Sequence, residues 1–194
     1  MKVGRPKEFV EEEALNKAIQ LFWDYGYEAT STEDLLSAMK MGKGSMYHNF
    51  GGKREVAKLA LEKFGKDFIK DFTKTLEESS DHIEFIKDYF RKIAAKSIND
   101  YKRGCFMGNI IIELAPMDQS LEKIAIKVLK DFEQILKTEI VKAQKTGKLK
   151  TKENPNVLAR YLLNLWNGVY ITARMYPEHK ELTHLIEFQL QVLH

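Results

Sequence analysis

The densest group of residues suited to binding chemistry lies between Lys40 and Lys53, in the run KMGKGSMYHNFGGK. It combines ammonium, hydroxyl, phenol and imidazole groups with glycines, which in other proteins hold phosphates, metal ions or base edges. A phosphate-binding loop needs four residues between its first glycine and a Gly-Lys-Ser/Thr ending, and it follows a strand. Here Gly44 and Gly51–Gly52 have the wrong spacing and no strand precedes them. The sequence therefore argues against a nucleotide-binding loop.

Metal and redox chemistry are also disfavoured. The five histidines contain no H-x-x-x-H pair, and the nearest approach is His179 and His184, five positions apart. The single cysteine, Cys105, excludes an internal disulfide framework and is typical of a reducing compartment. We therefore expect no metal, no cofactor and no catalytic residue, and a cytoplasmic location.

Almost every segment has the apolar spacing of a helix. Apolar residues recur at three- and four-residue intervals from Ala14 to Phe22, and similar stripes follow to the end of the chain. The 194 residues are 44% hydrophobic and 30% charged with only four prolines, which indicates a folded helical protein. No stretch approaches the roughly 18 apolar residues of a membrane span. The prediction is an all-α fold of about nine helices, without a membrane segment.

Three of these helices precede residue 53. The first ends at Gly26, which we expect in the left-handed conformation of a helix C-terminus. The second begins after Ser31, with Asp34 as its capping partner, and the third covers about Lys43–Asn49. Short helices with a tight turn between the second and third predict a helix-turn-helix unit, whose last helix would enter the major groove of DNA.

Positive charge gathers in the same part of the chain. Lys2, Arg5 and Lys7 precede the first helix without an intervening acid. Residues 40–58 hold five Lys or Arg and one acid, a net charge of +4. This distribution is typical of a surface that binds phosphates, although two solvated basic patches explain the charge equally well.

The last two predicted helices, about residues 155–175 and 178–193, are apolar on nearly every side. Such helices need packing partners on more than one face. The chain's own core is one source of partners, and a symmetric dimer in which these helices meet their copies is the other. We expect the dimer, because paired reading helices would match a pseudo-palindromic DNA site.

Residues 8–60 resemble the N-terminal domain of the TetR/AcrR family of transcriptional regulators. The shared residues are Ala18, Leu21–Phe22, Gly26–Tyr27, Thr30, the run KGSMYHNF, and Lys53 after two glycines. The resemblance implies a DNA-binding helix-turn-helix domain in residues 1–52 and a helical ligand-binding and dimerisation domain in residues 53–194. It also implies a ligand-responsive regulator, which we expect to be a repressor. The homodimer would bind a pseudo-palindromic operator and be released by a small molecule or by modification of the free cysteine.

The resemblance also assigns DNA contacts to particular residues. These are Thr32, Lys43, Gly44, Ser45, Tyr47, His48 and Lys53. The residues at helix starts would bind phosphates, and the ring side chains would reach phosphates or base edges. Met46 and Phe50 should point into the core, while Arg5 and Lys7 could reach the DNA backbone as an arm.

Two positions depart from the family pattern. Lys40 stands where a glycine is usual, because the turn there requires a left-handed residue. A non-glycine residue in that conformation costs about 1 kcal/mol. Gly42 stands where a Ser or Thr normally caps the recognition helix, and it supplies no side-chain acceptor. We therefore expect a slightly reshaped turn before the recognition helix.

For the effector, the resemblance implies a site inside the C-terminal domain. The candidate residues are Cys105, Phe106, Asn109, Glu113, Trp166 and Tyr170, together with Phe90 and Ile110. Packed core explains any one of them as well. Cys105 follows Lys102 and Arg103 and precedes a helix, which would favour the thiolate of an oxidant or electrophile sensor. A small buried apolar residue is the alternative.

Two other functions remain open from the sequence. One is a helical enzyme or ligand carrier built on the segment from Cys105 to Glu113. The other is an architectural DNA-binding protein without an effector.

Overall fold

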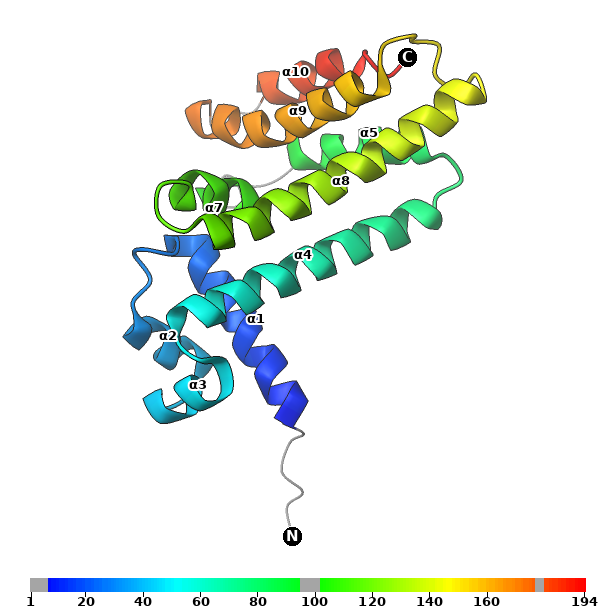
Figure 1. Ribbon diagram of the computed structural model, residues 1–194. Helices are drawn as coiled ribbons and strands as arrows, with labels where there is room; N and C mark the ends of the chain where they lie inside the picture. Colours follow the sequence, from blue (N-terminus) through cyan, green and yellow to red (C-terminus); the bar gives the residue numbers. More distant parts are fainter. Residues whose placement is uncertain (1–6, 95–101, 177–179) are drawn as a thin grey trace. The chain divides into compact units, whose positions relative to one another are not determined.

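The computed structural model describes residues 7–94, 102–176 and 180–194, and in those ranges the chain forms nine α-helices and no β-strand (Figure 1). The helices are α1 (Lys7–Tyr25), α2 (Thr32–Met39), α3 (Lys43–Phe50), α4 (Lys53–Glu77), α5 (His82–Ala94), α7 (Phe106–Leu114), α8 (Gln119–Lys145), α9 (Pro155–Met175) and α10 (Lys180–Leu190). The predicted all-α fold with an N-terminal helix-turn-helix is confirmed. The predicted arm residue Arg5 and the side chain of Lys7 lie outside the described residues.

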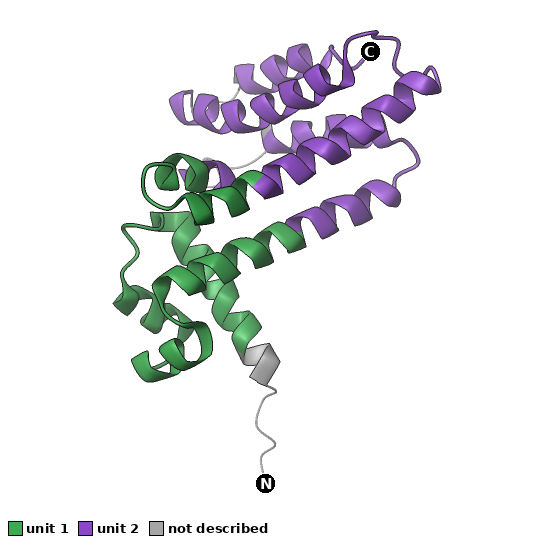
Figure 2. Cartoon of the chain, viewed as in Figure 1, with its two compact units in different colours: residues 1–67, 109–126 green, residues 68–108, 127–194 purple. Residues whose placement is uncertain are grey.

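The helices group into two compact units (Figure 2). Unit 1 comprises residues 1–67 and 109–126, and unit 2 comprises residues 68–108 and 127–194. Helices α4, α7 and α8 each contribute residues to both units. Unit 1 therefore contains the helix-turn-helix together with a segment that lies far along the chain, at the end of α7 and the beginning of α8.

The end of α1 follows the expected glycine geometry. Gly26 has φ of 87°, and its N–H donates to the carbonyl of Phe22 at 2.9 Å. The Tyr27 ring returns to pack on Phe22, with ring centroids 5.9 Å apart. A Cβ atom at Gly26 would lie 3.0 Å from both carboxylate oxygens of Glu113. Glycine is therefore required here for its backbone conformation and for space.

The start of α2 is a capping box. The Ser31 hydroxyl accepts the N–H of Asp34 at 3.1 Å, and the Asp34 carboxylate accepts the N–H of Ser31 at 2.9 Å. Hydrogen bonds from Ser31 lower the pKa of Asp34, so this carboxylate stays ionised. The two reciprocal bonds satisfy amides that the helix leaves unpaired, and they set the direction in which α2 leaves the loop.

The turn between α2 and α3 is closed by a left-handed lysine. Lys40 has φ of 53° and ψ of 47°, and among the described residues it is the one non-glycine with positive φ. Its N–H donates to the carbonyl of Ser37, and the N–H of Met41 donates to that of Leu36 at 3.1 Å. These bonds complete the C-terminus of α2 in the pattern that favours glycine. The predicted left-handed conformation at this turn is therefore confirmed, with Lys40 in it.

Unit 2 is built around aromatic side chains from three helices. The Phe132 ring of α8 is fully buried, and its centroid lies 5.2 Å from Phe68 and 5.0 Å from Phe72 of α4. Trp166 of α9 packs edge-on against Phe132 at 5.6 Å. Edge-to-face rings add specific geometry to the burial of large apolar surfaces. This packing fixes α9 within unit 2.

Helix α10 is attached to α5 by ion pairs. The Arg91 guanidinium on α5 donates through Nε to Glu187 of α10 at 2.7 Å. The same side chain contacts Glu84 and Asp88 on its own helix. These carboxylates raise the pKa of Arg91, first of all through the hydrogen bond to Glu187. The pairs hold α10 in place beside α5 while leaving one face of α10 uncovered.

Candidate nucleic-acid interface

Helix α3 buries one face and exposes the other. Met46 and Phe50 are buried, as predicted. The exposed side chains are Lys43, Ser45, Tyr47, His48 and Asn49. An eight-residue helix is about 12 Å long, close to the width of the major groove of B-DNA. The outward face of α3 therefore presents an ammonium, a hydroxyl, a phenol, an imidazole and an amide on a rod of suitable size.

The N-terminal end of α3 is open and positively polarised. Gly42 caps it in an extended conformation without a side-chain hydrogen bond, and the first turn contains no acidic residue. A Cβ atom added at Gly42 or at Gly44 would meet no atom within 4 Å. The backbone of the first turn is therefore accessible, and its amides and the Lys43 ammonium attract anions.

Tyr47 is positioned by the glycine that follows α3. Its side chain is 50% exposed. Gly52 has φ of 121°, and a Cβ atom there would lie 3.2 Å from Cε1 of the Tyr47 ring. The glycine thus lets the backbone pass directly under the ring, which restricts the rotamers of Tyr47. A ring held in this way can offer its hydroxyl to a phosphate or base with little loss of conformational entropy.

Asn49 adds a polar side chain to the exposed face of α3 that was not singled out in the sequence. Its Nδ2 donates to the Ser45 hydroxyl oxygen at 3.1 Å, one helical turn away. Because the Ser45 oxygen accepts this hydrogen bond, its O–H remains available to donate a hydrogen bond to a group outside the protein. The four-residue spacing of Ser45 and Asn49 on a short predicted helix could have indicated this hydrogen bond.

Lys53 and Thr32 lie at the helix starts where phosphate contacts were predicted. The Lys53 ammonium sits 4.4 Å from the centroid of the Tyr27 ring and 3.4 Å from the carbonyl oxygen of Glu28. In this structure Lys53 therefore ties the α1–α2 loop to the start of α4. Thr32 is half-buried at the first position of α2, next to the ionised Asp34. Phosphate binding by either residue stays a prediction.

Two long-range contacts brace the helix-turn-helix within unit 1. The Glu113 carboxylate of α7 accepts the N–H groups of Tyr27 at 3.0 Å and of Glu28 at 2.8 Å. The Asp118 carboxylate accepts Nε of Arg54 at 2.7 Å and Nη2 at 3.2 Å, which is a two-point pair. Arg54 and two backbone amides of α8 lower the pKa of Asp118, first through the Arg54 hydrogen bond. Glu113 thus fixes the loop before α2, and Asp118 fixes the start of α4, so the segments before and after the α2–α3 unit are both anchored.

The predicted effector residues fall into two groups. Cys105, Phe106, Trp166 and Tyr170 belong to unit 2, whereas Asn109 and Glu113 belong to unit 1. Asn109 is exposed, and the Glu113 carboxylate is occupied by the backbone amides described above. The structure therefore brings four of the six into the same unit.

Cys105 has two N–H groups directed at its sulfur. The indole Nε1 of Trp166 lies 3.2 Å from Sγ, and the backbone N of Gly108 lies 3.3 Å from it. Tyr89 stacks on Trp166 with centroids 5.5 Å apart and planes 7° apart. Burial, with a smaller contribution from Cys105, raises the pKa of Tyr89 to about 12, so its hydroxyl stays protonated. A half-buried thiol thus lies against a stacked pair of aromatic rings.

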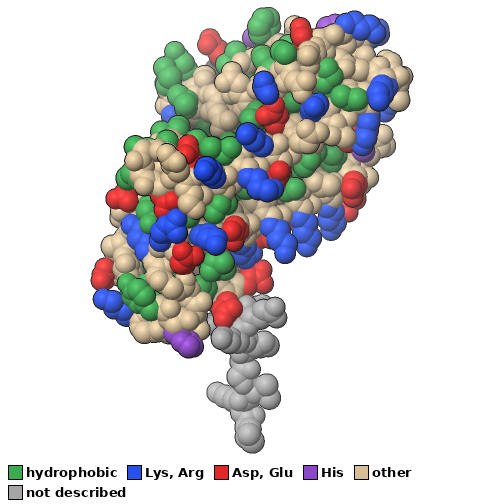
Figure 3. All heavy atoms as spheres, in the orientation of Figure 1, with side chains coloured by type: hydrophobic (Ala, Val, Ile, Leu, Met, Phe, Trp, Pro, Cys, Tyr) green, Lys and Arg blue, Asp and Glu red, His purple; other side chains and the backbone are tan. Residues whose placement is uncertain are grey.

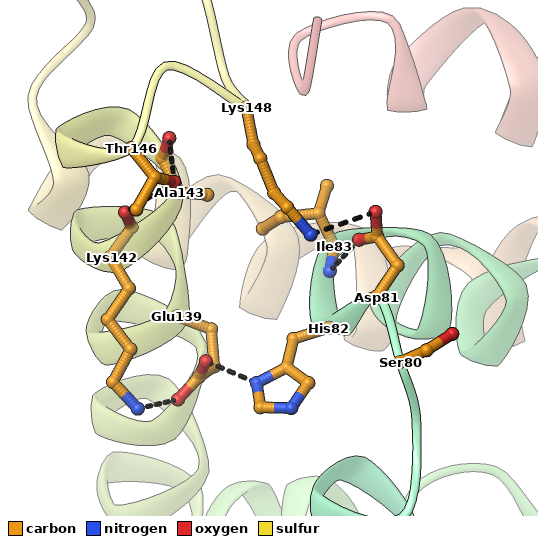
Figure 4. A pocket seen from close by; sticks show the side chains of 9 residues that line it. All are labelled: Ser80, Asp81, His82, Ile83, Glu139, Lys142, Ala143, Thr146 and Lys148. Carbon is orange, nitrogen blue, oxygen red and sulfur yellow. Dashed lines mark hydrogen bonds and ion pairs between the residues drawn. The ribbon is translucent and has the colours of Figure 1, made fainter.

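A separate pocket of about 240 Å³ lies in unit 2 between the start of α5 and the end of α8 (Figure 4). The buried Glu139 carboxylate accepts Lys142 at 2.7 Å and contacts Nδ1 of His82 at 2.6 Å. Lys148, which follows α8, pairs with Asp81 before α5 at 3.3 Å (Figure 4). Because each cation already has a carboxylate partner, the pocket offers no excess charge to select a ligand. We interpret this group as a structural connection between the helices.

This interpretation predicts a pH-dependent contribution of Glu139 to stability. Burial raises the pKa of Glu139, but hydrogen bonds and charges from Lys142 and His82 outweigh it and leave the pKa below its usual value. Glu139→Gln should therefore reduce the free energy of unfolding by about 1–3 kcal/mol at pH 7. A group with a depressed folded-state pKa stabilises above the unfolded-state value, about 4.5, and loses this effect as the pH falls. In urea denaturation, the difference in free energy of unfolding between variant and wild type should become smaller below about pH 4.5. A difference that stays constant down to pH 3 would contradict the assignment.

Neither metal-binding nor membrane-spanning features are found in the described part of the chain. No group of three or more His, Cys, Asp or Glu side chains there is arranged to hold a metal ion. No described helix combines the length and apolar character needed to cross a bilayer.

Comparison with known proteins gives matches along both parts of the chain. Residues 14–60 match the family described as "Bacterial regulatory proteins, tetR family", and residues 81–188 match "Tetracyclin repressor-like, C-terminal domain". The transcriptional repressor ComR of Escherichia coli (strain K12) is 30% identical over 88% of this chain and 82% of its own length. The repressor DhaR of Mycobacterium sp. (strain GP1) is 23% identical, over 95% of this chain and 92% of its own.

Solved structures show the same fold. A cysteine mutant of the regulator CifR in complex with a 26-bp double-strand operator has a TM-score of 0.82 at 20% identity, covering 98% of this chain and 100% of that one. The reduced form of Escherichia coli NemR has a TM-score of 0.84 at 19% identity, covering 95% and 97%. The family matches confirm the resemblance noted in the sequence, and the solved structures share the fold over nearly the whole chain.

Proposed function

This chain belongs to the TetR family of bacterial transcriptional regulators, and we propose that it represses transcription as a homodimer bound to a pseudo-palindromic operator in the cytoplasm. Members of this family are regulators and not enzymes, so the predicted absence of catalysis is confirmed. An effector, or modification of Cys105, would release the protein from DNA. The observation that carries the proposal is the exposed polar face of α3 on a buried Met46–Phe50 anchor.

In the proposed complex α3 enters the major groove. Lys43 and the open first turn bind backbone phosphates, while Ser45, Tyr47 and His48 reach phosphates or base edges. Gly44 supports this arrangement because nothing covers it, so DNA can approach the helix backbone closely. The CifR relative, which has the same fold, has been solved with operator DNA.

Selection of bound duplexes from random sequence tests this function. The wild-type protein should enrich a site with two inverted half-sites, one helical turn or a multiple apart, as a two-fold dimer requires. Recovery without sequence enrichment, or enrichment of a single half-site, would overturn the proposal.

The dimer is proposed to form through α9 and α10. Large apolar side chains on these helices remain exposed, at 59% for Ile171, 64% for Met175 and 64% for Phe188. Hydrophobic side chains accordingly show on the surface of this part of the molecule (Figure 3). A groove of about 100 Å³ between the two helices runs past Gly168, where an added Cβ would meet nothing within 4 Å. An apolar surface with a small residue at its centre fits a second copy of the same helices.

The effector is proposed to bind in unit 2 beside the stacked Tyr89–Trp166 pair. Cys105 and Tyr170 contact Trp166 of this pair, Phe106 follows Cys105 in the chain, and the protonated Tyr89 hydroxyl supplies a donor. Effector binding by Asn109 and Glu113, which belong to unit 1, stays a prediction. The effector would release DNA only to the extent that it binds the DNA-incompetent conformation more tightly.

Cys105 supplies a separate prediction. N–H groups directed at a sulfur stabilise the thiolate, which is the reactive form. Because the chain has one cysteine, N-ethylmaleimide should add a single label and lower operator affinity by about tenfold or more. Cys105→Ser should bind the operator as wild type does and ignore the reagent. Absence of labelling in the folded protein, or a serine variant that still responds, would remove Cys105 from the mechanism.

A further inference from the structure

We propose that the Lys40 side chain is an additional contact to the DNA backbone, held at the turn before α3 at a cost to folding stability. The inference deepens the proposed function and rests on it, because it concerns the same interface. It starts from the one non-glycine with positive φ in the described part of the chain.

The backbone geometry at this position does not need a lysine. The left-handed conformation, with φ of 53° and ψ of 47°, is formed by backbone hydrogen bonds that any residue can make. Glycine adopts it without the clash that a Cβ atom suffers. A lysine at this position is therefore less favourable for folding than a glycine.

Nothing in the described part of the chain compensates for this strain. The Lys40 side chain is exposed, and it makes no ion pair or hydrogen bond with the described residues. No described aromatic ring lies beneath its ammonium in the way that Tyr27 lies beneath that of Lys53. Sparsely populated conformations of this sort are concentrated at functional sites, where a partner outside the chain supplies the benefit.

The position of Lys40 indicates what that partner is. It lies three residues before Lys43 and directly ahead of the open Gly42 cap of α3. No acidic residue lies between Lys40 and the end of α3 to neutralise it. An exposed ammonium on a flexible stem pairs with a phosphate as a mobile point charge and releases a condensed counterion. Lys40 and Lys43 would therefore both pair with phosphates of the duplex that α3 binds.

Three variants at this position separate the charge from the strain. Lys40→Gly removes both, Lys40→Ala removes the charge only, and Lys40→Arg keeps both. Lys130→Ala is the matched control, because Lys130 is exposed on α8 in unit 2 and its loss also removes one positive charge. Tyr47→Ala is the positive control, because it removes a proposed DNA contact of α3.

Binding would be measured by fluorescence anisotropy on the duplex that wild type selects from random sequence. Lys40→Gly and Lys40→Ala should both bind roughly 10- to 50-fold more weakly at about 100 mM salt, with the slope of log affinity against log salt shallower by about 2 per dimer. Lys40→Arg should match wild type. Lys40→Gly alone should raise the midpoint of thermal unfolding, by about 2–4 °C. Stability and DNA affinity should therefore change in opposite directions in a single variant.

The experiment distinguishes a failure of the Lys40 contact from a failure of the proposed DNA-binding function. If Tyr47→Ala weakens binding but Lys40→Gly and Lys40→Ala behave like Lys130→Ala, the Lys40 contact is wrong and the DNA-binding function stands. If wild type selects no duplex, or Tyr47→Ala binds unchanged, the proposed interface itself is wrong. Equal losses for Lys130→Ala and the Lys40 variants would assign the effect to net charge and overturn the local contact.

Discussion

Replacing Tyr47 by alanine should weaken operator binding by roughly two orders of magnitude while leaving the fold intact. A tyrosine hydroxyl bonded to a charged phosphate contributes about 1.5 kcal/mol, and a dimer loses two such bonds. The sum, about 3 kcal/mol, corresponds to roughly a hundredfold in the dissociation constant. The side chain is half exposed and contacts Gly52 at its ring edge, so its truncation removes little buried surface.

The measurement is anisotropy at matched salt on the selected duplex, with thermal unfolding as the check on folding. Tyr47→Phe is the matched variant, because it keeps the ring on Gly52 and deletes only the hydroxyl. It should lose nearly as much affinity as Tyr47→Ala if the hydrogen bond carries the effect. An affinity within twofold of wild type for both variants would show that Tyr47 does not face the DNA.

Replacing Phe188 by aspartate should separate the dimer into monomers. Phe188 is 64% exposed on α10, and Ile171 and Met175 of α9 are exposed to a similar extent. Burying a large apolar side chain contributes about 1.5–3 kcal/mol, and a two-fold interface buries it twice. The variant loses this contribution and adds two unpaired carboxylates. The dimer dissociation constant should therefore rise by roughly a thousandfold or more.

Sedimentation or size-exclusion at micromolar concentration would detect this change, and operator affinity should fall with it because the two half-sites are no longer read together. Ile112→Asp is the matched control, since Ile112 is 76% exposed on α7 in unit 1, outside α9 and α10. It should remain a dimer. If Phe188→Asp elutes with wild type while Ile112→Asp does not, the dimer uses another surface.

Features set by neighbouring residues could be predicted from the sequence. The capping box of Ser31 and Asp34 and the left-handed Gly26 follow from hydrogen bonds within a few positions, whereas the left-handed turn at Lys40 was implied by the family pattern. The start of α9 has the same local character, with Asn154 as its cap and Pro155 at its first position. The buried Met46 and Phe50 follow from helical periodicity. Local signals of this kind define where helices begin, end and face.

The connections between distant segments could not be predicted. Glu113 and Tyr27 are 86 positions apart, and the sequence favoured Glu113 as a ligand residue with no sign that loop amides occupy its carboxylate. The pairs Trp166–Cys105 and His82–Glu139 are 61 and 57 positions apart. Each depends on how helices pack, which periodicity alone does not specify, because any apolar face can pack against several others.

The Arg54–Asp118 pair illustrates the same limit at the interface. Arg54 counted only as one more positive charge in the basic stretch before the structure placed it on Asp118. A cation that is already paired contributes less to phosphate binding than an unpaired one. The basic surface around α3 therefore depends more on Lys40 and Lys43 than the charge count suggests.

The most direct test of the account is amide hydrogen exchange of the wild-type dimer with and without the selected duplex. We expect slower exchange in residues 43–50 and at the turn from Lys40 to Gly42, with unit 2 helices such as α5 unchanged at the amides of their cores. Protection confined to other surfaces, with the amides of α3 exchanging at the same rate in both states, would contradict the claim that α3 reads the DNA.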